Sequence, residues 1–255
     1  MSNRCVLEIC VESVDHAVAA ERGGADRIEL CSDLPSGGIT PSAGLMRTAR
    51  RQVEIPVHVL IRPRPGDFFY SGSEYEIMRD DILAAKELGM DGVVLGLLQR
   101  NTLVDVERTR ALVELARPLP VTFHRAFDVC ENSEVALEEV IQTGASRILT
   151  SGGEARATDA LLALARLVQA AQDRIVLMPC GGINFENIVE VVRTTLAREV
   201  HTSAGTSSPD VAGNGKNTST SSDTTSSIPP VASFENKVAT LIRLLSNVPN
   251  DELAT

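Results

Sequence analysis

Short β-branched runs alternate with amphipathic stretches along most of this chain, and this alternation constrains the fold more than any other feature. The runs lie at 5–11, 27–31, 56–61, 92–96, 121–125, 147–151, 175–180 and 199–203. Helix-like stretches lie at 14–22, 42–52, 74–88, 105–116, 133–142, 158–171 and 185–196, and a last one follows at 234–246. Strand–helix alternation predicts parallel strands joined by right-handed crossovers, and eight such units predict a closed (β/α)8 barrel, known as a TIM barrel.

An open, doubly wound sheet is the alternative fold, but no GxGxxG sequence opens a helix after the first run. A length of 255 residues suits a single barrel domain over residues 1–255. Residues 206–230, after the eighth run, are rich in Ser and Thr and poor in apolar residues. Such a composition cannot bury enough apolar area to order itself, so we expect a disordered insertion there, a solvated linker rather than a lid.

Charge and composition narrow the possible partners. The formal net charge of −10 at pH 7 argues against a nucleic acid or an anionic membrane surface as partner. No apolar run approaches the roughly 20 residues that span a bilayer, and the N-terminus has no long apolar segment typical of a secretory signal. An odd number of cysteines, 5, does not suggest a disulfide scaffold. We therefore expect a cytoplasmic protein.

Strand parity predicts an unusually polar barrel interior. Side chains alternate across a strand, so residues such as Leu7 and Ile9 suit the helix layer and their neighbours face inward. The expected interior side chains are Glu8, Cys10, Glu29, Cys31, His58, Arg62, His124 and His201. One interpretation is a salt-bridge cluster that fills the barrel, with Arg62 and the histidines paired to the two carboxylates. The other is an acid–base site at the mouth, where crowded carboxylates shift each other's pKa. The fourth histidine, His16, is expected on the surface of a helix.

Two cysteines end the first and second strands with the same parity. Neighbouring strands are about 4.8 Å apart, so the sulfurs of Cys10 and Cys31 could approach closely. Two thiolates suit a soft ion such as Cu(I), although the spacing of the pair follows no metal-binding motif. Two small buried apolar side chains are the plainer interpretation, and the residues alone leave both open.

Glycine pairs follow the sixth and seventh strands, in "TSGGE" and "PCGGIN". Backbone N–H groups in such turns suit an anion, which makes Ser151, Gly152, Gly153, Gly181 and Gly182 candidates for binding one; tight turns would need the same glycines. The loop after the third strand, "RPRPGDFFYSGSEYE", adds Arg62 and Arg64, whose guanidinium groups bind carboxylate or phosphate, unless the loop is merely stiffened by its prolines. A barrel enzyme of unknown reaction, acting on a small phosphorylated or carboxylated substrate, would use such a site.

Some enzyme classes are disfavoured by what the chain lacks. Lys86 and Lys237 fall on expected helices and Lys216 lies in the Ser/Thr-rich segment, so no lysine is expected in the interior for a Schiff base. The sequence has no GxSxG, P-loop or HExxH motif.

Several long motifs together resemble the CutC family of copper homeostasis proteins. They are "ERGGADRIELCSDLPSGGITPS", "IRPRPGDFFYSGSE", "VTFHRAFD", "ILTSGG" and "VHTSA", and the similarity covers about residues 6–205 and the last helix. The resemblance implies a (β/α)8 barrel in the cytoplasm. It also implies copper handling, with Cu(I) held by the cysteines at positions 10 and 31. It carries no established enzymatic activity, so a copper-binding protein is favoured over an enzyme.

One position departs from the family pattern. Cys180 stands where a family "MPGGGI" motif has glycine, so it either crowds the expected anion site or adds a third thiol. Barrels commonly self-associate, and we expect a homo-oligomer.

Overall fold

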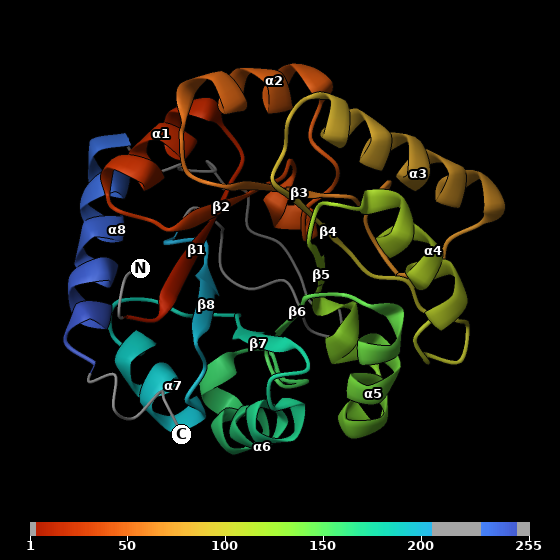
Figure 1. Cartoon of the computed structure of the whole chain (residues 1–255). Helices are drawn as coiled ribbons and strands as arrows, with labels where there is room; N and C mark the ends of the chain where they lie inside the picture. Colours follow the sequence, from red (N-terminus) through yellow and green to blue (C-terminus); the bar gives the residue numbers. More distant parts are fainter. Residues whose placement is uncertain (1–3, 206–230, 249–255) are drawn as a thin grey trace, which may run out of the picture.

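Eight strands form the inner layer of the computed structural model, which describes residues 4–205 and 231–248. The strands are β1 (Val6–Val11), β2 (Arg27–Leu30), β3 (Val57–Leu60), β4 (Gly92–Leu95), β5 (Val121–Phe123), β6 (Arg147–Thr150), β7 (Val176–Pro179) and β8 (Glu199–Thr202). Figure 1 shows them enclosed by a ring of helices. The Ser/Thr-rich segment 206–230 lies outside the described residues, so its expected disorder stays a prediction.

The outer layer consists of helices that follow the strands one by one. They are α1 (Val14–Arg22), α2 (Ala43–Gln52), α3 (Gly72–Glu87), α4 (Val106–Ala116), α5 (Ser133–Thr143), α6 (Leu161–Ala171), α7 (Ile188–Thr195) and α8 (Val231–Ser246). Short 3-10 helices precede three of them, η1 (Leu34–Ser36), η2 (Arg125–Val129) and η3 (Ala157–Asp159). Side-chain caps begin several helices; Ser71 and Glu74 form a reciprocal capping box at the start of α3.

All the paired strands run parallel, in the order β7-β6-β5-β4-β3-β2-β1-β8. The two ends of this order, β7 and β8, pack against each other. The hydroxyl of Thr202 on β8 also donates to the carbonyl of Ile183, just after β7. The sheet is therefore a nearly closed (β/α)8 barrel, which confirms the predicted fold.

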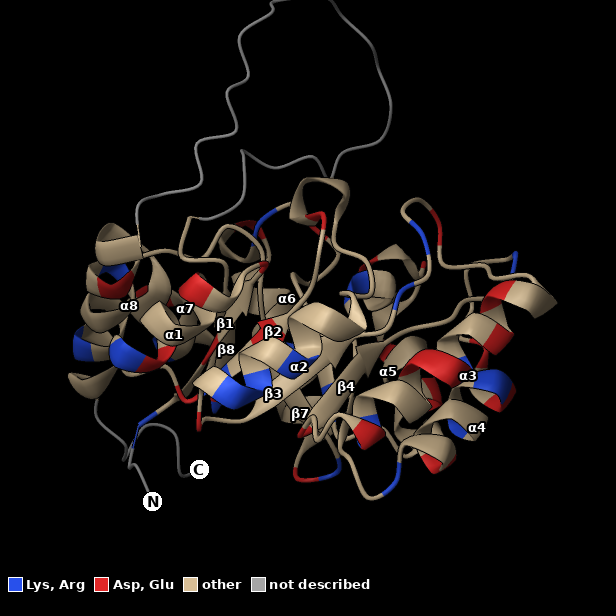
Figure 2. Ribbon diagram, turned by 90° about the horizontal axis from the view of Figure 1, so that it is seen from above, with Lys and Arg blue, Asp and Glu red and all other residues tan. Residues whose placement is uncertain are grey.

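Strand parity also holds. Leu7, Ile9 and Ile28 are fully buried between the strands and the helices, whereas Glu8 and Glu29 point to the barrel interior and contact residues of other strands there. Figure 2 shows basic and acidic residues interspersed over the outer helices. Among the helices of residues 4–205 and 231–248, none combines the length and apolar content that crossing a bilayer requires.

Two predictions about local structure need correction. His16 is not a surface residue, because α8 covers α1; its side chain is buried and meets the ring of Phe234 edge-on, with ring centroids 4.7 Å apart. The fifth strand ends at Phe123 rather than at residue 125. The chain turns there because the His124 side chain caps the 3-10 helix η2 and accepts a hydrogen bond from the backbone N–H of Ala126.

Candidate functional site

A cavity of about 380 Å³ opens at the carboxyl ends of the strands, where barrel proteins form their sites. Many of the residues predicted from the sequence line it. These are Cys10, Glu29, Cys31, Arg62, His124, Gly181, Gly182 and His201, together with Cys180. Glu8 and His58 lie deeper in the barrel, and Arg64, Ser151, Gly152 and Gly153 are not part of the lining.

The two cysteines meet in this cavity. The sulfur atoms of Cys10 and Cys31 are 3.5 Å apart, and both side chains are buried. In the pairing of β1 with β2, Cys10 lies opposite Glu29. Cys31 directly follows β2, and its backbone N–H donates to the carbonyl oxygen of Val11. The hydrogen bond between the thiols and their burial raise the pKa of Cys10 well above its usual range. Without a metal ion, Cys10 is therefore a neutral thiol at neutral pH.

A carboxylate and an imidazole lie next to this thiol pair. One ligand atom each from Cys10, Glu29 and His201 fall within 4.8 Å of one another. His201 Nε2 is 3.7 Å from the carboxylate of Glu29, and His201 Nδ1 is 2.7 Å from Glu8. Burial raises the pKa of Glu29, whereas the pKa of His201 is raised by its two carboxylate partners against the opposing effect of burial. The group offers sulfur, nitrogen and oxygen donors at one point.

Beneath the cavity, an ion-pair network fills the barrel. Glu8 pairs with Arg27, which also binds Glu199 at 2.6 Å; Arg147 binds Glu199 at 2.8 Å. Although burial alone would raise the pKa of Glu8, its partners hold that pKa well below its usual range. Of the partners expected for the two carboxylates, His201 contacts both, whereas Arg62 instead donates to loop carbonyls.

The sequence analysis did not predict three members of this network, Arg27, Arg147 and Glu199. A signal was present for two of them. Arg27 is two residues before Glu29 and Glu199 is two residues before His201, so each shares the inward parity of a residue already recognised. The alternation of side chains therefore predicts an interior side chain at the first residue of a strand just as it does at the last.

His58 lies across the interior above a glycine. Its Nδ1 is 4.0 Å from Glu8, and burial lowers the pKa of His58 to about 4. Gly92 on β4 makes room for the ring, because a Cβ on Gly92 would lie 2.5 Å from two of its atoms. His58 is thus a neutral part of the packing below the cavity.

The loop after β6 binds an anion that belongs to the chain. The backbone N–H groups of Ser151 and Gly153 donate to the carboxylate of Asp128, at 3.0 and 3.3 Å, and the N–H of Gly152 donates to Thr150. The carboxylate of Asp128, a residue that sequence reasoning missed, thus occupies two of these three amides. Of the two glycine pairs, only Gly181 and Gly182 reach the cavity.

Arg64 is likewise occupied elsewhere. Its guanidinium binds Asp67 at 2.9 Å and also pairs with Glu74. Arg62 therefore lines the cavity, whereas Arg64 lies in the loop outside it.

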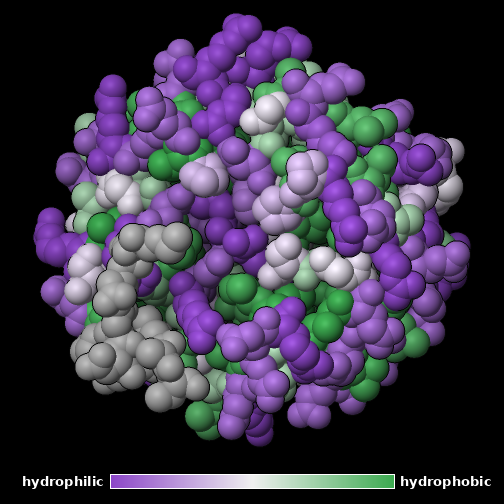
Figure 3. Space-filling view, in the orientation of Figure 1, coloured by the Kyte–Doolittle hydropathy of each residue, from purple (hydrophilic) through white to green (hydrophobic). Residues whose placement is uncertain are grey.

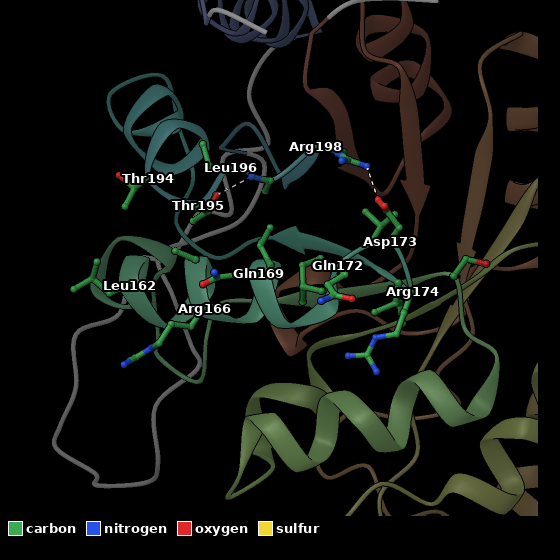
Figure 4. A pocket seen from close by; sticks show the side chains of 17 residues that line it. Leu162, Arg166, Gln169, Gln172, Asp173, Arg174, Thr194, Thr195, Leu196 and Arg198 are labelled. Atoms are coloured by element: carbon green, nitrogen blue, oxygen red, sulfur yellow. Dashed lines mark hydrogen bonds and ion pairs between the residues drawn. The ribbon is translucent and has the colours of Figure 1, made fainter. Parts of the chain in front are cut away.

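A larger groove of about 1120 Å³ lies between α6 and α7. Figure 4 shows Leu162, Arg166 and Gln169 on one side and an ion pair between Arg198 and Asp173 at 3.1 Å. In Figure 3, hydrophobic residues gather in the lower centre, over the β6–β7 region labelled in Figure 1. The described residues that line this groove include no cysteine, histidine or glutamate, so it lacks the chemistry of the cavity at the strand ends.

The fold and the cavity define a (β/α)8-barrel protein whose mouth holds a close thiol pair beside a carboxylate and an imidazole. The model of the CutC family matches residues 5–206. The chain belongs to the CutC family, as the motifs quoted above led us to expect.

Curated relatives agree with this assignment. The chain is 48% identical over 203 residues to the copper homeostasis protein cutC homolog of Homo sapiens, with 80% of this chain and 74% of the human protein covered. It is 47% identical over 199 residues to a family protein CutC of Mesorhizobium japonicum, with 78% of this chain and 77% of the relative covered.

Solved structures support the same fold. The structure of CutC from Streptococcus agalactiae matches with a TM-score of 0.75 and 33% identity, covering 78% of this chain and 98% of that chain. A thiamine phosphate pyrophosphorylase from Pyrococcus furiosus matches with a TM-score of 0.60 and 18% identity, covering 96% and 97%. The second likeness concerns the barrel fold alone.

Proposed function

We propose that this chain is a cytoplasmic copper homeostasis protein that takes up Cu(I) as its cargo through Cys10 and Cys31. The observation that carries the proposal is the 3.5 Å contact between the two sulfur atoms in the wall of the cavity. The names of the curated relatives supply the biological context.

The donor set fits a soft ion better than a hard one. Thiolates favour Cu(I), whereas Mg²⁺ and Ca²⁺ require several oxygen donors in a defined shell. Glu29 and His201 stand beside Cys10 and supply a third or fourth donor, or accept the protons that the thiols release. A structural zinc site would need four protein ligands that close the coordination shell, and here the cavity remains open on one side.

Cu(I) binding should depend strongly on pH. The pKa of Cys10 is raised by its hydrogen bond with Cys31 and by burial; burial raises the pKa of Cys31, although its bond with Cys10 opposes this. Because the metal binds thiolates, each ligating thiol loses a proton on binding. The apparent affinity is therefore expected to fall with decreasing pH, by up to about 100-fold per pH unit if both thiols release a proton.

Anaerobic competition with a chromogenic Cu(I) chelator tests the proposal. We expect one Cu(I) per chain, and a loss of at least ~100-fold in affinity in Cys10→Ser and in Cys31→Ser, because losing a direct ligand costs at least as much as losing its supporting residue. Cys5→Ser is the matched control, since Cys5 is also buried but donates to Ala197 at the other end of β1. Unchanged affinity in both mouth variants would overturn the proposal.

Cys180→Ser examines the departure from the family pattern. Cys180 lines the same cavity and packs with Leu149 and Met178. If Cys180 is only a packing residue, its replacement leaves Cu(I) affinity within about twofold of the original protein.

The other function predicted from the sequence is a barrel enzyme for a small phosphorylated or carboxylated substrate. Its candidate residues Glu29, Arg62, His124 and His201 lie in the cavity, as do Gly181 and Gly182 of its expected anion site. The predicted homo-oligomer also stays a prediction.

A further inference from the structure

Arg62 is a buried cation that the described chain does not neutralise. Only 5% of its surface is exposed. Its terminal nitrogens donate to the carbonyl oxygens of Ser36, Gly38 and Gly66, at 3.2, 2.7 and 2.8 Å. No carboxylate of residues 4–205 or 231–248 forms an ion pair with Arg62, and its Nε–H has no acceptor among them. Carbonyl dipoles orient the guanidinium, but its positive charge remains, and buried charges are normally paired.

His124 presents a second unused donor. Its Nδ1 accepts a hydrogen bond from the backbone N–H of Ala126 at 3.1 Å, so the ring proton must be on Nε2. The side chain is 5% exposed, and Nε2 has no partner within the described residues. Burial and the nearby charge of Arg62 lower the pKa of His124 to about 3. At neutral pH, His124 is therefore a neutral imidazole with a fixed, unoccupied N–H donor.

One aromatic side chain holds both groups in position. The ring of Phe68 lies 4.9 Å from the ring of His124, measured between centroids, and Arg62 Cζ lies 5.1 Å from the same Phe68 centroid. Gly96 permits the close packing of His124, because a Cβ there would lie 2.6 Å from Nδ1. All three side chains, Arg62, Phe68 and His124, line the cavity of about 380 Å³ that also holds the thiols.

We propose that this cavity binds the anionic oxygen group of a small molecule, a carboxylate or a phosphoryl group, at the part of its wall that Arg62 and His124 form. A buried cation and a neutral donor without acceptors are costly to maintain, and such groups are retained where a ligand completes their hydrogen bonds. A guanidinium binds anionic oxygens through directed N–H bonds, and a neutral imidazole N–H adds a donor without needing a proton from solvent. The site is separate from the thiol pair, so the inference goes beyond the proposed copper binding.

Titration calorimetry of the reduced, copper-free protein tests this site with inorganic phosphate and with pyruvate, and with glycerol as an uncharged control. We expect saturable binding of at least one anion and none of glycerol. The anion that binds distinguishes a phosphoryl from a carboxylate group. The absence of saturable binding by both anions would overturn the proposal.

Three variants assign the binding to the named atoms. His124→Asn keeps an acceptor for the Ala126 N–H and removes the Nε2 donor, and Arg62→Met removes the charge. Each is expected to weaken anion binding by at least ~10-fold. Arg64→Met is the matched control, because Arg64 lies in the same loop but pairs with Asp67 and Glu74 outside the cavity lining; its affinity should stay within about twofold.

Two further comparisons keep the result interpretable. Arg62→Met removes three loop contacts and can disturb folding, so His124→Asn decides the outcome in that case: unchanged anion affinity in His124→Asn contradicts the proposal. Cys10→Ser and Cys31→Ser should lose Cu(I) and keep the anion. Failure of the copper proposal and failure of the anion site are thus measured on different variants and with different ligands.

Discussion

Individual residues in this barrel have their protonation states set by burial and by their partners. His58 and His124 are both buried, and their pKa values fall to about 4 and about 3. His201 is also buried, but its contacts with Glu8 and Glu29 raise its pKa. The pKa values of these three histidines therefore shift in opposite directions, because among them His201 alone makes a short contact with a carboxylate, 2.7 Å from Glu8.

The lowered pKa of His124 predicts an acid-sensitive fold. The unfolded chain binds a proton at His124 below about pH 6.5 and the folded chain does not until about pH 3, so stability is lost as pH falls through this window. We expect His124→Asn, which does not titrate there, to reduce the slope of unfolding free energy against pH by up to about 1.4 kcal/mol per pH unit. Urea denaturation from pH 7 to 4 measures it. An unchanged slope would mean that folding does not lower the pKa of His124.

At the level of elements, β4 makes the polar interior possible by contributing little volume. Gly92 is its first residue and Gly96 follows its last, and each lies against a histidine ring of a neighbouring strand or loop. The remaining β4 side chains are fully buried valines and a leucine. Val93 and Leu95 join the main hydrophobic core, Val94 packs inside the barrel with Cys10 and Cys31, and the two glycines leave space for His58 and His124.

Replacing Gly92 by alanine tests this arrangement. The added Cβ would lie 2.5 to 2.8 Å from three atoms of the His58 ring, so the ring must move, and we expect a destabilisation of about 1–3 kcal/mol. Gly72→Ala at the start of α3 is the control, because a Cβ there meets nothing within 4 Å. Equal unfolding midpoints for both variants in urea would show that the space above Gly92 is not needed.

At the scale of the whole molecule, the barrel closes between β7 and β8. Thr202 donates its hydroxyl to the Ile183 carbonyl and accepts from the N–H of Ala204, which ties the end of β8 to the loop after β7. Gly181 and Gly182 of that loop, and His201 of β8, line the cavity. Closure of the sheet and the shape of the site thus depend on the same contacts.

Thr202→Val should loosen this closure. The valine leaves the Ile183 carbonyl and the Ala204 N–H without partners in a buried place, which costs about 1–3 kcal/mol. We expect faster hydrogen exchange of β8 amides and a lower urea midpoint. Thr240→Val on α8, where the hydroxyl donates to its own helix, should change stability by less than about 0.5 kcal/mol. If β8 exchange is unaffected, the closure does not depend on this hydroxyl.

The sequence by itself determined the number and order of the strands, the inward side chains and the nearness of Cys10 to Cys31. These follow from periodicity along the chain and from the fact that successive strands of a barrel are neighbours. Only the tertiary structure decided which groups pair across the interior: Arg27 rather than Arg62 with Glu8, and Asp128 rather than a ligand on the amides after β6. These pairings depend on the stagger between strands and on where each loop turns. The residue pattern along a single strand contains no information about either.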